Sequence, residues 1–377
     1  MSNFTLRRED VDDLMLGLGI LGTGGGGDPE WGKAIIENDF AHGRVCTIID
    51  PDDVEDDAFV CSGGIMGSVK SLDKLSYKDV VAGWENDFIL VKAFREMERL
   101  KGKKLNYVIP IESGGLNTPV VMSLAARMHV PMVNADGLGR ATPETQMASF
   151  IGHGVSLTPM PLVDLYGNTV IVADSKEPTY ADEIGRIVVT RGGGLGANAH
   201  YAMSGKQLKN SCVPGVVTRA LEIGRTITKA RAEGGNPVQA FAKEANGVKI
   251  FEGVIESVQG EDKGGFYLVN VLIKGTNEFV DSTCKMVIKN EIMAVWVNEQ
   301  EKCILPDLAC MLDPESGMGI MSSDLRNDMQ IAIIGVPCHE RLRECFNTEI
   351  GAAAFSGSRY GHSEVQYRPV ELLNRSK

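Results

Sequence analysis

Two short segments of the sequence carry carboxylates beside glycines. In ESGGLNT, Glu112 is followed by two glycines and Asn117, so a carboxylate, an amide and exposed backbone N–H groups share one predicted turn. Such a turn can bind a polar ring or stabilise an oxyanion. In ADGLGRATPE, Asp136, Arg140 and Glu144 add two carboxylates and a guanidinium. Each segment also has a structural interpretation, in which Glu112 caps the following helix and Arg140 forms a local salt bridge.

A run of glycines near the N-terminus is the third candidate. GTGGGGDP, residues 22–29, fits G-x-G-x-x-G, but a predicted helix precedes it where a dinucleotide-binding loop needs a strand. A Walker loop would place Lys and Ser or Thr after the last glycine, where this chain has Asp28 and Pro29. The run either only ends a helix or also lets a ligand approach the backbone of Gly24, Gly25 and Gly26. We expect Asp28 to cap the next helix, to accept an N–H from a ligand, or both.

Nucleophile and metal motifs are not recognisable. Cys61 and Ser62 end a predicted strand, but no His is placed to activate them. The eight cysteines contain no C-x-x-C pair and the six histidines no H-x-x-x-H pair. A zinc site assembled from distant residues would leave no spacing signal, so zinc stays open as a cofactor and no ligand is assigned. Asn290, Glu291 and Asp307 are predicted to serve turns and caps.

The candidate residues follow strands of a predicted α/β domain over residues 1–172. Short apolar runs rich in β-branched residues alternate with helical periodicity, a pattern typical of a mostly parallel sheet covered by helices. Ligands bind at the carboxyl ends of such strands. We therefore expect three loops to converge on one crevice: SGGIMGS with Gly63 and Gly64, ESGGLNT with Gly114 and Gly115, and DGLGR. Thr142 and Pro143 are predicted to start a further helix.

The pattern changes in residues 173–377. Helices are predicted near residues 181–191 and 216–231, with a glycine-rich loop at 192–205 between them. Four later apolar segments, residues 249–260, 264–275, 285–297 and 331–338, are separated by Gly and Asn turns and read as strands. This half is predicted to be an α+β domain rich in antiparallel strands.

Composition excludes several classes of partner. The net charge of −12 disfavours nucleic acid and anionic membrane surfaces, which are bound mainly through Lys and Arg. No apolar run approaches the roughly 20 residues of a membrane span, and the acidic N-terminus does not resemble a signal peptide, so we expect a cytoplasmic protein. A small-molecule substrate and a homo-oligomer are predicted.

Several sequence blocks together resemble a known family. They are LGTGGGGDP, ESGGLNTP, VNADGLGRATPETQM, IKNEIMAVW with ILPDLACMLDPESG, and YRPVELL. In this order they are similar to the family described as S-methyl-thiohydantoin-desulfurase-like, whose two domains would meet near residues 170–180. The resemblance implies association with hydantoinase- and oxoprolinase-type enzymes and action on a thiohydantoin ring, with C=S replaced by C=O. The candidate residues that stand in the family's blocks are Asp28, Glu112, Asn117, Asp136, Arg140 and Glu144.

Two functional hypotheses follow from the residues and the resemblance. In the first, the chain hydrolyses a hydantoin-like or thiohydantoin-like cyclic amide, with Glu112 or Asp136 as general base and Arg140 orienting the substrate. Backbone N–H groups of the glycine loops would polarise the reacting group. In the second, the chain is a non-catalytic binding or accessory subunit of a hydantoinase-like enzyme. A nucleotide-binding protein, suggested only by the glycine count, is disfavoured by Asp28.

Overall fold

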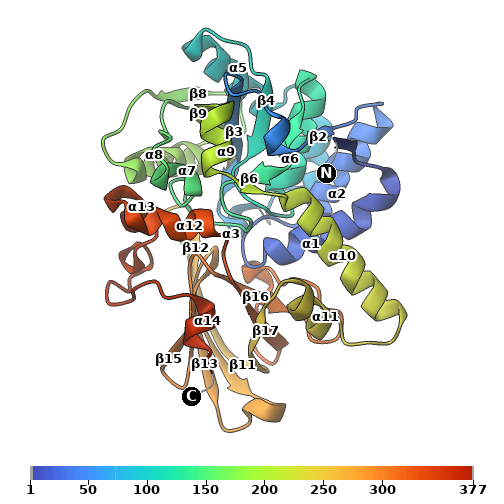
Figure 1. The fold of residues 1–377 in the computed structure, drawn as a ribbon, viewed down its shortest axis with the longest axis vertical. Coiled ribbons are helices and arrows are strands. Elements are labelled where there is room, and N and C mark those ends of the chain that lie inside the picture. Colours follow the sequence, from blue (N-terminus) through green and yellow to red (C-terminus); the bar gives the residue numbers. More distant parts are fainter. Residues whose placement is uncertain (1–2, 73, 376–377) are drawn as a thin grey trace.

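A computed structural model describes residues 3–72 and 74–375 and contains two main sheets (Figure 1). The first sheet has eight strands in the order β1-β2-β5-β4-β3-β9-β7-β8. Their bounds are β1 Phe4–Thr5, β2 Thr47–Ile49, β3 Phe59–Gly67, β4 Tyr107–Pro110, β5 Met132–Val133, β7 Met160–Asp164, β8 Thr169–Val172 and β9 Leu195–Ser204.

The strands β2, β5, β4 and β3 of this sheet are parallel. Their central residues Ile48, Val108 and Met132 are fully buried, as expected for parallel strands covered on both faces. β9 and the flanking strands β1, β7 and β8 join the sheet in antiparallel pairs. The predicted α/β class, with a mixed, mostly parallel sheet and helices, is confirmed.

Helices surround the first sheet and place the glycine run between two of them. α1 (Val11–Leu21) precedes the run and α2 (Pro29–Ala41) follows it. Asp28 caps α2 by accepting a hydrogen bond from the Glu30 N–H at 2.9 Å, as predicted. The other long helices are α5 Ile89–Lys101, α6 Asn117–Met128, α8 Pro178–Arg191 and α10 Val216–Ala232, and α10 packs along α1.

The second sheet has seven antiparallel strands in the order β15-β14-β13-β12-β11-β17-β16. They are β11 Val248–Lys263, β12 Phe266–Gly275, β13 Thr283–Lys289, β14 Glu291–Val297, β15 Gln300–Ile304, β16 Leu308–Leu312 and β17 Gln330–Val336. Alternating Val, Ile and Met side chains on one face form its core. The predicted strand-rich C-terminal half is therefore confirmed.

Short elements complete the fold, and two of the C-terminal helices, α12 (Glu340–Glu344) and α13 (Glu349–Ala354), lie between the two sheets in Figure 1. The short elements are α3 Val69–Leu72, α4 Tyr77–Gly83, α7 Ser149–Gly152, α9 Gly205–Ser211, α11 Pro237–Glu244, α12 Glu340–Glu344, α13 Glu349–Ala354, α14 Val370–Leu373, and the paired strands β6 Ala135–Asp136 and β10 Val213–Pro214. No helix among the described residues is long and apolar enough to cross a membrane.

Three local predictions were wrong. SGGIMGS is not a loop, because β3 continues to Gly67, and the predicted loop at 192–205 is mostly strand β9. These two segments pair with each other from Phe59↔Ser204 to Gly67↔Leu195, which gives both backbones hydrogen-bond partners. No helix starts at Thr142, since the N–H groups of Thr142 and Thr145 bond to the side chains of Glu112 and Asp182. Tertiary hydrogen bonds thus replace helix formation at 142–148.

The first sheet also extends beyond the expected domain boundary at residue 172. β9 lies between β3 and β7, in the interior of the eight-stranded sheet. The chain therefore returns to the first sheet before it builds the second one.

Candidate functional site

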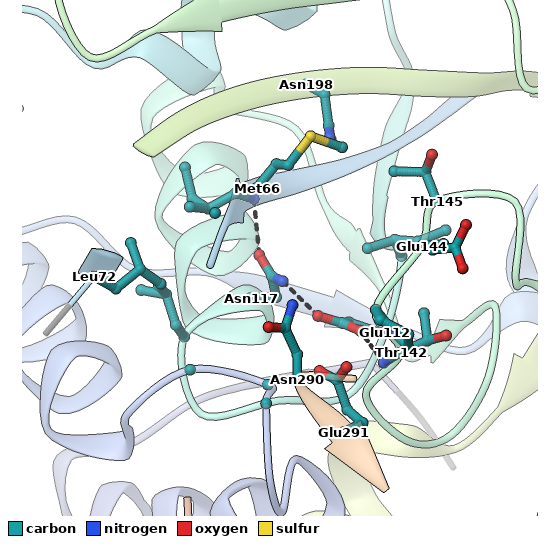
Figure 2. A pocket seen from close by; sticks show the side chains of 18 of the residues that line it. Met66, Leu72, Glu112, Asn117, Thr142, Glu144, Thr145, Asn198, Asn290 and Glu291 are labelled. Atoms are coloured by element: carbon teal, nitrogen blue, oxygen red, sulfur yellow. Dashed lines mark hydrogen bonds between the residues drawn. The ribbon is translucent and has the colours of Figure 1, made fainter. Parts of the chain in front are cut away.

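A small cavity of about 50 Å³ lies where both halves of the chain meet (Figure 2). The glycine run, the end of β3, the turn before α6, residues 142–145, β9 and the β13–β14 turn all contribute to its walls. Its lining residues are Gly25, Gly26, Gly27, Ile65, Met66, Gly67, Leu72, Ile111, Glu112, Leu116, Asn117, Thr142, Pro143, Glu144, Thr145, Arg186, Asn198, Asn290 and Glu291.

Glu112 is held as a hydrogen-bonded, buried carboxylate. One oxygen accepts from the Asn117 Nδ2 and the other from the Thr142 N–H, both at 2.5 Å. Asn117 is itself fixed, because its Oδ1 accepts from the Ile65 N–H at 2.8 Å. Burial raises the pKa of Glu112 to about 7, although both hydrogen bonds oppose this rise. Glu112 can therefore exchange a proton near neutral pH.

Glu291, the first residue of β14, supplies a second buried carboxyl. Only 2% of the residue is exposed, and its Oε2 has no hydrogen-bond partner among the described residues. Burial, and then the negative charge of Glu112, raise the pKa of Glu291 well above its ordinary value. Since two neighbouring carboxyls do not both ionise readily, Glu291 is the better holder of the proton and Glu112 the better carboxylate.

Further polar atoms around the cavity lack partners. The Asn198 Oδ1 and the Thr142 Oγ1 are buried without a hydrogen bond in the described part of the chain. Asn198 is only 3% exposed and projects from β9, opposite Gly64 of β3. Buried polar atoms are normally paired, so such a group at a cavity indicates a place for a ligand or water.

Close contact between backbones shapes the glycine run. Gly22 ends α1 with its N–H bonded to the Leu18 carbonyl, and the Leu116 N–H bonds to the Gly26 carbonyl at 3.0 Å. A Cβ on Gly26 would come within 2.8 Å of the Gly114 Cα, a distance that side chains do not tolerate. The run thus both ends the helix and brings its backbone against the turn that carries Glu112.

We expect Gly25→Ala to reduce ligand binding more than stability. Its methyl group would overlap the Glu291 carboxylate and lie 3.0 Å from the Asn290 carbonyl carbon, so Glu291 must move. A Cβ on Gly83 in α4 would have no atom of the described residues within 4 Å, which makes Gly83→Ala the matched control. Thermal melting and ligand titration of both variants test this. Equal binding by the Gly25→Ala variant and the wild type would contradict it.

Glu144 faces the cavity from an ion cluster that joins the two halves. Its Oε1 accepts from the Lys289 Nζ at 2.6 Å, and its Oε2 accepts from Arg359 and, at 2.7 Å, from Gln146. Burial would raise the pKa of Glu144, but the hydrogen bond from Arg359 and the charges of Lys289 and Arg359 together lower it. Glu144 is therefore an ionised, fully paired carboxylate.

Asp136 lies outside the cavity lining, in a closed network of its own. Its Oδ1 accepts from the N–H groups of Leu138 and Gly139, at 2.8 and 2.5 Å, and its Oδ2 from the Ser113 Oγ at 2.5 Å. The residue is fully buried, and burial raises its pKa to about 7. The geometry suits a carboxyl that shapes the loop after β6.

The raised pKa of Asp136 predicts a pH-dependent stability. A carboxyl whose folded pKa is above its unfolded value stabilises the fold below about pH 4 and loses that contribution as pH rises toward 7. The loss is on the order of 4 kcal/mol. Asp136→Asn keeps acceptors for both backbone N–H groups, so we expect its melting temperature to fall less than that of the wild type between pH 5 and pH 8. Parallel pH dependence of the two proteins would contradict this.

Arg140 is buried and does not line the cavity. Its Nη1 donates to the Asp307 carbonyl at 2.8 Å and its Nε to the Ala141 carbonyl at 2.8 Å. No direct salt bridge to a carboxylate is present among the described residues, which contradicts the alternative, structural interpretation of Arg140 as part of a local salt bridge. Arg140 instead ties the loop after β6 to the second sheet, and its charge slightly lowers the pKa of Glu112.

Of the candidate residues, the structure brings Gly25, Gly26, Glu112, Asn117 and Glu144 together in the cavity wall. The glycines behind this wall allow close packing: for example, a Cβ on Gly64 would lie 2.8 Å from the Asn117 Oδ1. Asp28 lines an adjacent cavity. The candidates outside the lining of the small cavity are Gly24, Asp28, Gly63, Gly64, Gly114, Gly115, Asp136 and Arg140.

Sequence reasoning missed several residues of the cavity wall. Glu291 and Asn290 were expected only to serve a turn; Asn290 does so, with a φ of 59° and a bond from the Tyr267 N–H to its Oδ1. Nothing in the sequence marks Asn198 or Arg186 as part of a site. The signal that could have found Glu291 is a carboxylate within a strongly apolar strand, since such a group is costly to bury without a reason.

Ser62 and His200 are opposite each other in the β3–β9 register. Both are fully buried, yet neither the Ser62 Oγ nor either His200 ring nitrogen forms a hydrogen bond in the described structure. Burial lowers the pKa of His200 to about 3, so the ring is neutral. Without a Ser–His hydrogen bond, this pair lacks the geometry of an activated nucleophile. Among the described residues, no group of three or more His, Cys, Asp or Glu is arranged to hold a metal ion.

Comparisons with known proteins agree with this architecture. No curated protein matches the sequence. A crystal structure of a protein from Chromobacterium violaceum is similar with a TM-score of 0.76, over 97% of this chain and 100% of its own, at 22% identity. That identity establishes a common fold only.

Two family models match in sequence. The model of the S-Me-THD-like N-terminal domain covers residues 9–174, and that of the S-Me-THD-like C-terminal domain covers residues 176–370. Together they span nearly the whole chain, so the protein belongs to the S-Me-THD-like family.

Proposed function

We propose that this protein is a hydrolase acting on a hydantoin-like or thiohydantoin-like cyclic amide. The observation that carries the proposal is the buried pair of carboxyls at the cavity, Glu112 and Glu291. Glu112 is hydrogen-bonded as a carboxylate, whereas one oxygen of Glu291 has no partner in the part of the chain that the structure describes, so the two environments favour different protonation states. Such a pair provides a base and an acid for one reaction.

In the proposed reaction, the Glu112 carboxylate removes a proton from water as the water oxygen attacks the thiocarbonyl carbon. The C=S π electrons move to sulfur, which takes a proton from Glu291. As the tetrahedral intermediate collapses, its hydroxyl proton passes to the Glu291 carboxylate, C=O forms and the C–S bond breaks. The leaving sulfur takes the proton held by Glu112 and departs as hydrogen sulfide, so both carboxyls return to their starting states. The sum is C=S plus water giving C=O plus H₂S.

The polar groups around the cavity suit an uncharged ring with N–H donors. The Asn198 Oδ1 is an acceptor without a partner among the described residues, so it can take a hydrogen bond from a ring N–H. Arg186, the only cationic side chain among the described lining residues, already donates to the Gly67 and Gly265 carbonyls, both at 3.2 Å. A negatively charged reacting group would therefore meet two carboxyls and no available cation.

Turnover assays with 5-substituted 2-thiohydantoins and hydantoins test the proposal. Sulfide release and loss of the thiocarbonyl absorbance report the reaction, and calorimetry on the same compounds reports binding. Assays with a chelator, with Zn²⁺ and with Mn²⁺ examine a metal requirement. Turnover of any ring with water uptake supports the hydrolase. Binding without turnover under all metal conditions would instead favour the accessory-subunit hypothesis, and absence of both would refute the proposal.

A further inference from the structure

Three buried polar side chains lie next to one another on one face of the β3–β9 pair. Ser62 is opposite His200, and Gly64 is opposite Asn198. Since alternate residues of a strand share a face, Asn198 and His200 project to the same side as Ser62. All three residues are buried, and of the three only Asn198 lines the cavity. We call Ser62, Asn198 and His200 the inner polar cluster.

The inner polar cluster has more hydrogen-bonding capacity than the described residues satisfy. Four of its atoms are buried without a partner in this part of the chain: the Ser62 Oγ, both His200 ring nitrogens and the Asn198 Oδ1. The neutral imidazole has one N–H donor and one acceptor nitrogen, and the hydroxyl can both donate and accept. The cluster therefore offers donors and acceptors together, which suits water, since water also does both.

The spacing within the cluster fits bridging by water. Opposite residues of an antiparallel pair have Cβ atoms about 4.5–5.5 Å apart, and alternate residues of one strand are about 7 Å apart. A water with two hydrogen bonds of about 2.8 Å joins polar atoms about 5 Å apart. One water between Ser62 and His200, and a second between His200 and Asn198, would satisfy all four atoms. Buried waters typically bond in this way to groups that otherwise lack partners.

We propose that the inner polar cluster binds one or two internal water molecules and supplies from them the water that reacts at Glu112. This inference rests on the proposed function, because it assumes that a ring is hydrolysed in the cavity. The cavity of about 50 Å³ has room for only one or two water molecules at about 30 Å³ each, so an entering ring displaces them. Water held by Ser62 and His200 lies outside the cavity lining and can stay while the ring is bound.

Asn198 connects the cluster to the reacting carboxylate. It is opposite Gly64, and a Cβ on Gly64 would lie 2.8 Å from the Asn117 Oδ1. Asn117 in turn donates to Glu112. The Asn198 Oδ1 has two lone pairs, so it can accept from a water of the cluster and from a ring N–H at the same time. A water that passes Asn198 therefore enters the cavity on the side where Asn117 holds Glu112.

A crystal structure of the wild type, at a resolution that shows ordered water, tests the water site without any need for turnover. We expect one or two waters within hydrogen-bond distance of the Ser62 Oγ and the His200 ring nitrogens. In the His200→Phe variant, whose ring can keep the edge contact with Tyr201, this density should be lost. A wild-type structure without water at these atoms would overturn the inference, whatever the activity of the protein.

Kinetics of Ser62→Ala and His200→Phe test the supply of water. We expect kcat for a 2-thiohydantoin to fall about tenfold in each, the effect of about one lost hydrogen bond to the water. The Kd of the ring, measured by calorimetry, should stay within about twofold of wild type, because Asn198 is unchanged. A wild-type kcat in both variants would overturn the role of the cluster in the reaction.

Cys61→Ala is the matched control. It removes one buried atom at the neighbouring position, on the other face of β3, and should keep the wild-type kcat. A fall in kcat equal to that of Ser62→Ala would mean that loss of packing is the cause, which also overturns the supply of water. If the wild type turns over none of the rings, the hydrolase proposal and the supply of water fail together, and the crystallographic density alone decides whether the cluster binds water.

Discussion

Glu112→Gln is expected to lower kcat by about 10²–10⁴-fold, the usual contribution of a general base. The amide cannot accept a proton from water. Since both oxygens of Glu112 accept hydrogen bonds, from Asn117 and Thr142, the amide nitrogen of Gln must also face one of these donors. That mismatch costs about 1–3 kcal/mol, so the melting temperature should fall as well. The activity loss must therefore be measured at a temperature where the variant is folded.

Asp136→Asn is the control, because it changes the other predicted base in the same way but lies outside the cavity lining. We expect its kcat to stay within a few-fold of wild type. If the Asp136 variant lost activity and the Glu112 variant kept it, Asp136 and not Glu112 would be the general base. The wild-type kcat/KM should fall as pH drops below about 7, the raised pKa of Glu112, because protonation removes the base.

Glu144→Ala is expected to reduce the free energy of unfolding by about 3–5 kcal/mol. The substitution leaves Lys289, which is 7% exposed, as a buried ammonium without its carboxylate. Arg359 is less affected, since a quarter of its side chain is exposed and can turn to water. Chemical denaturation at pH 7 measures the change, and the size of the effect follows from the buried location of Lys289.

A compensating pair tests the cause of this loss. In Glu144→Leu/Lys289→Met both buried charges are replaced by apolar groups, so we expect most of the lost stability to return. A control at an exposed ion pair, Glu233→Ala next to Lys229, should change stability by less than about 1 kcal/mol. If the double variant is no more stable than Glu144→Ala, burial of an unpaired ammonium is not the cause.

Much of the fold was readable because local signals agree with it. Asp28 and Pro29 start α2 as their cap and first-turn chemistry predicts, and the alternation of Val, Ile and Leu in β11 and β12 marks an antiparallel sheet. In the segment at 142–148 the local signals do not agree with the fold. Thr142 and Pro143 have the form of a helix start, but hydrogen bonds to Glu112 and Asp182 hold the segment in another conformation. Propensity could not indicate those distant partners.

The sequence predicted only those parts of the candidate site that are close together along the chain. Glu112 and Asn117 lie within one turn, so their proximity is local and visible in the sequence. Glu291 approaches them only through the packing of β14 against the glycine run, and Asn198 only through the insertion of β9 beside β3. Long-range contacts of this kind carry no spacing signal in a single sequence. Asp136 and Arg140 are the opposite case. Their place in a glycine loop suggested a site, but their hydrogen bonds all hold parts of the fold together.

The position of β9 and the two buried carboxyls make the two domains of this chain depend on each other. Glu112 comes from the region of the N-terminal family model and Glu291 from that of the C-terminal one. A cut at their junction would leave one fragment without a strand from the middle of its sheet, and each fragment with only one of the two buried carboxyls. The cavity can therefore form only when both domains are present together. If either domain were replaced by one from another protein, the replacement would have to keep the surface that contacts the remaining domain.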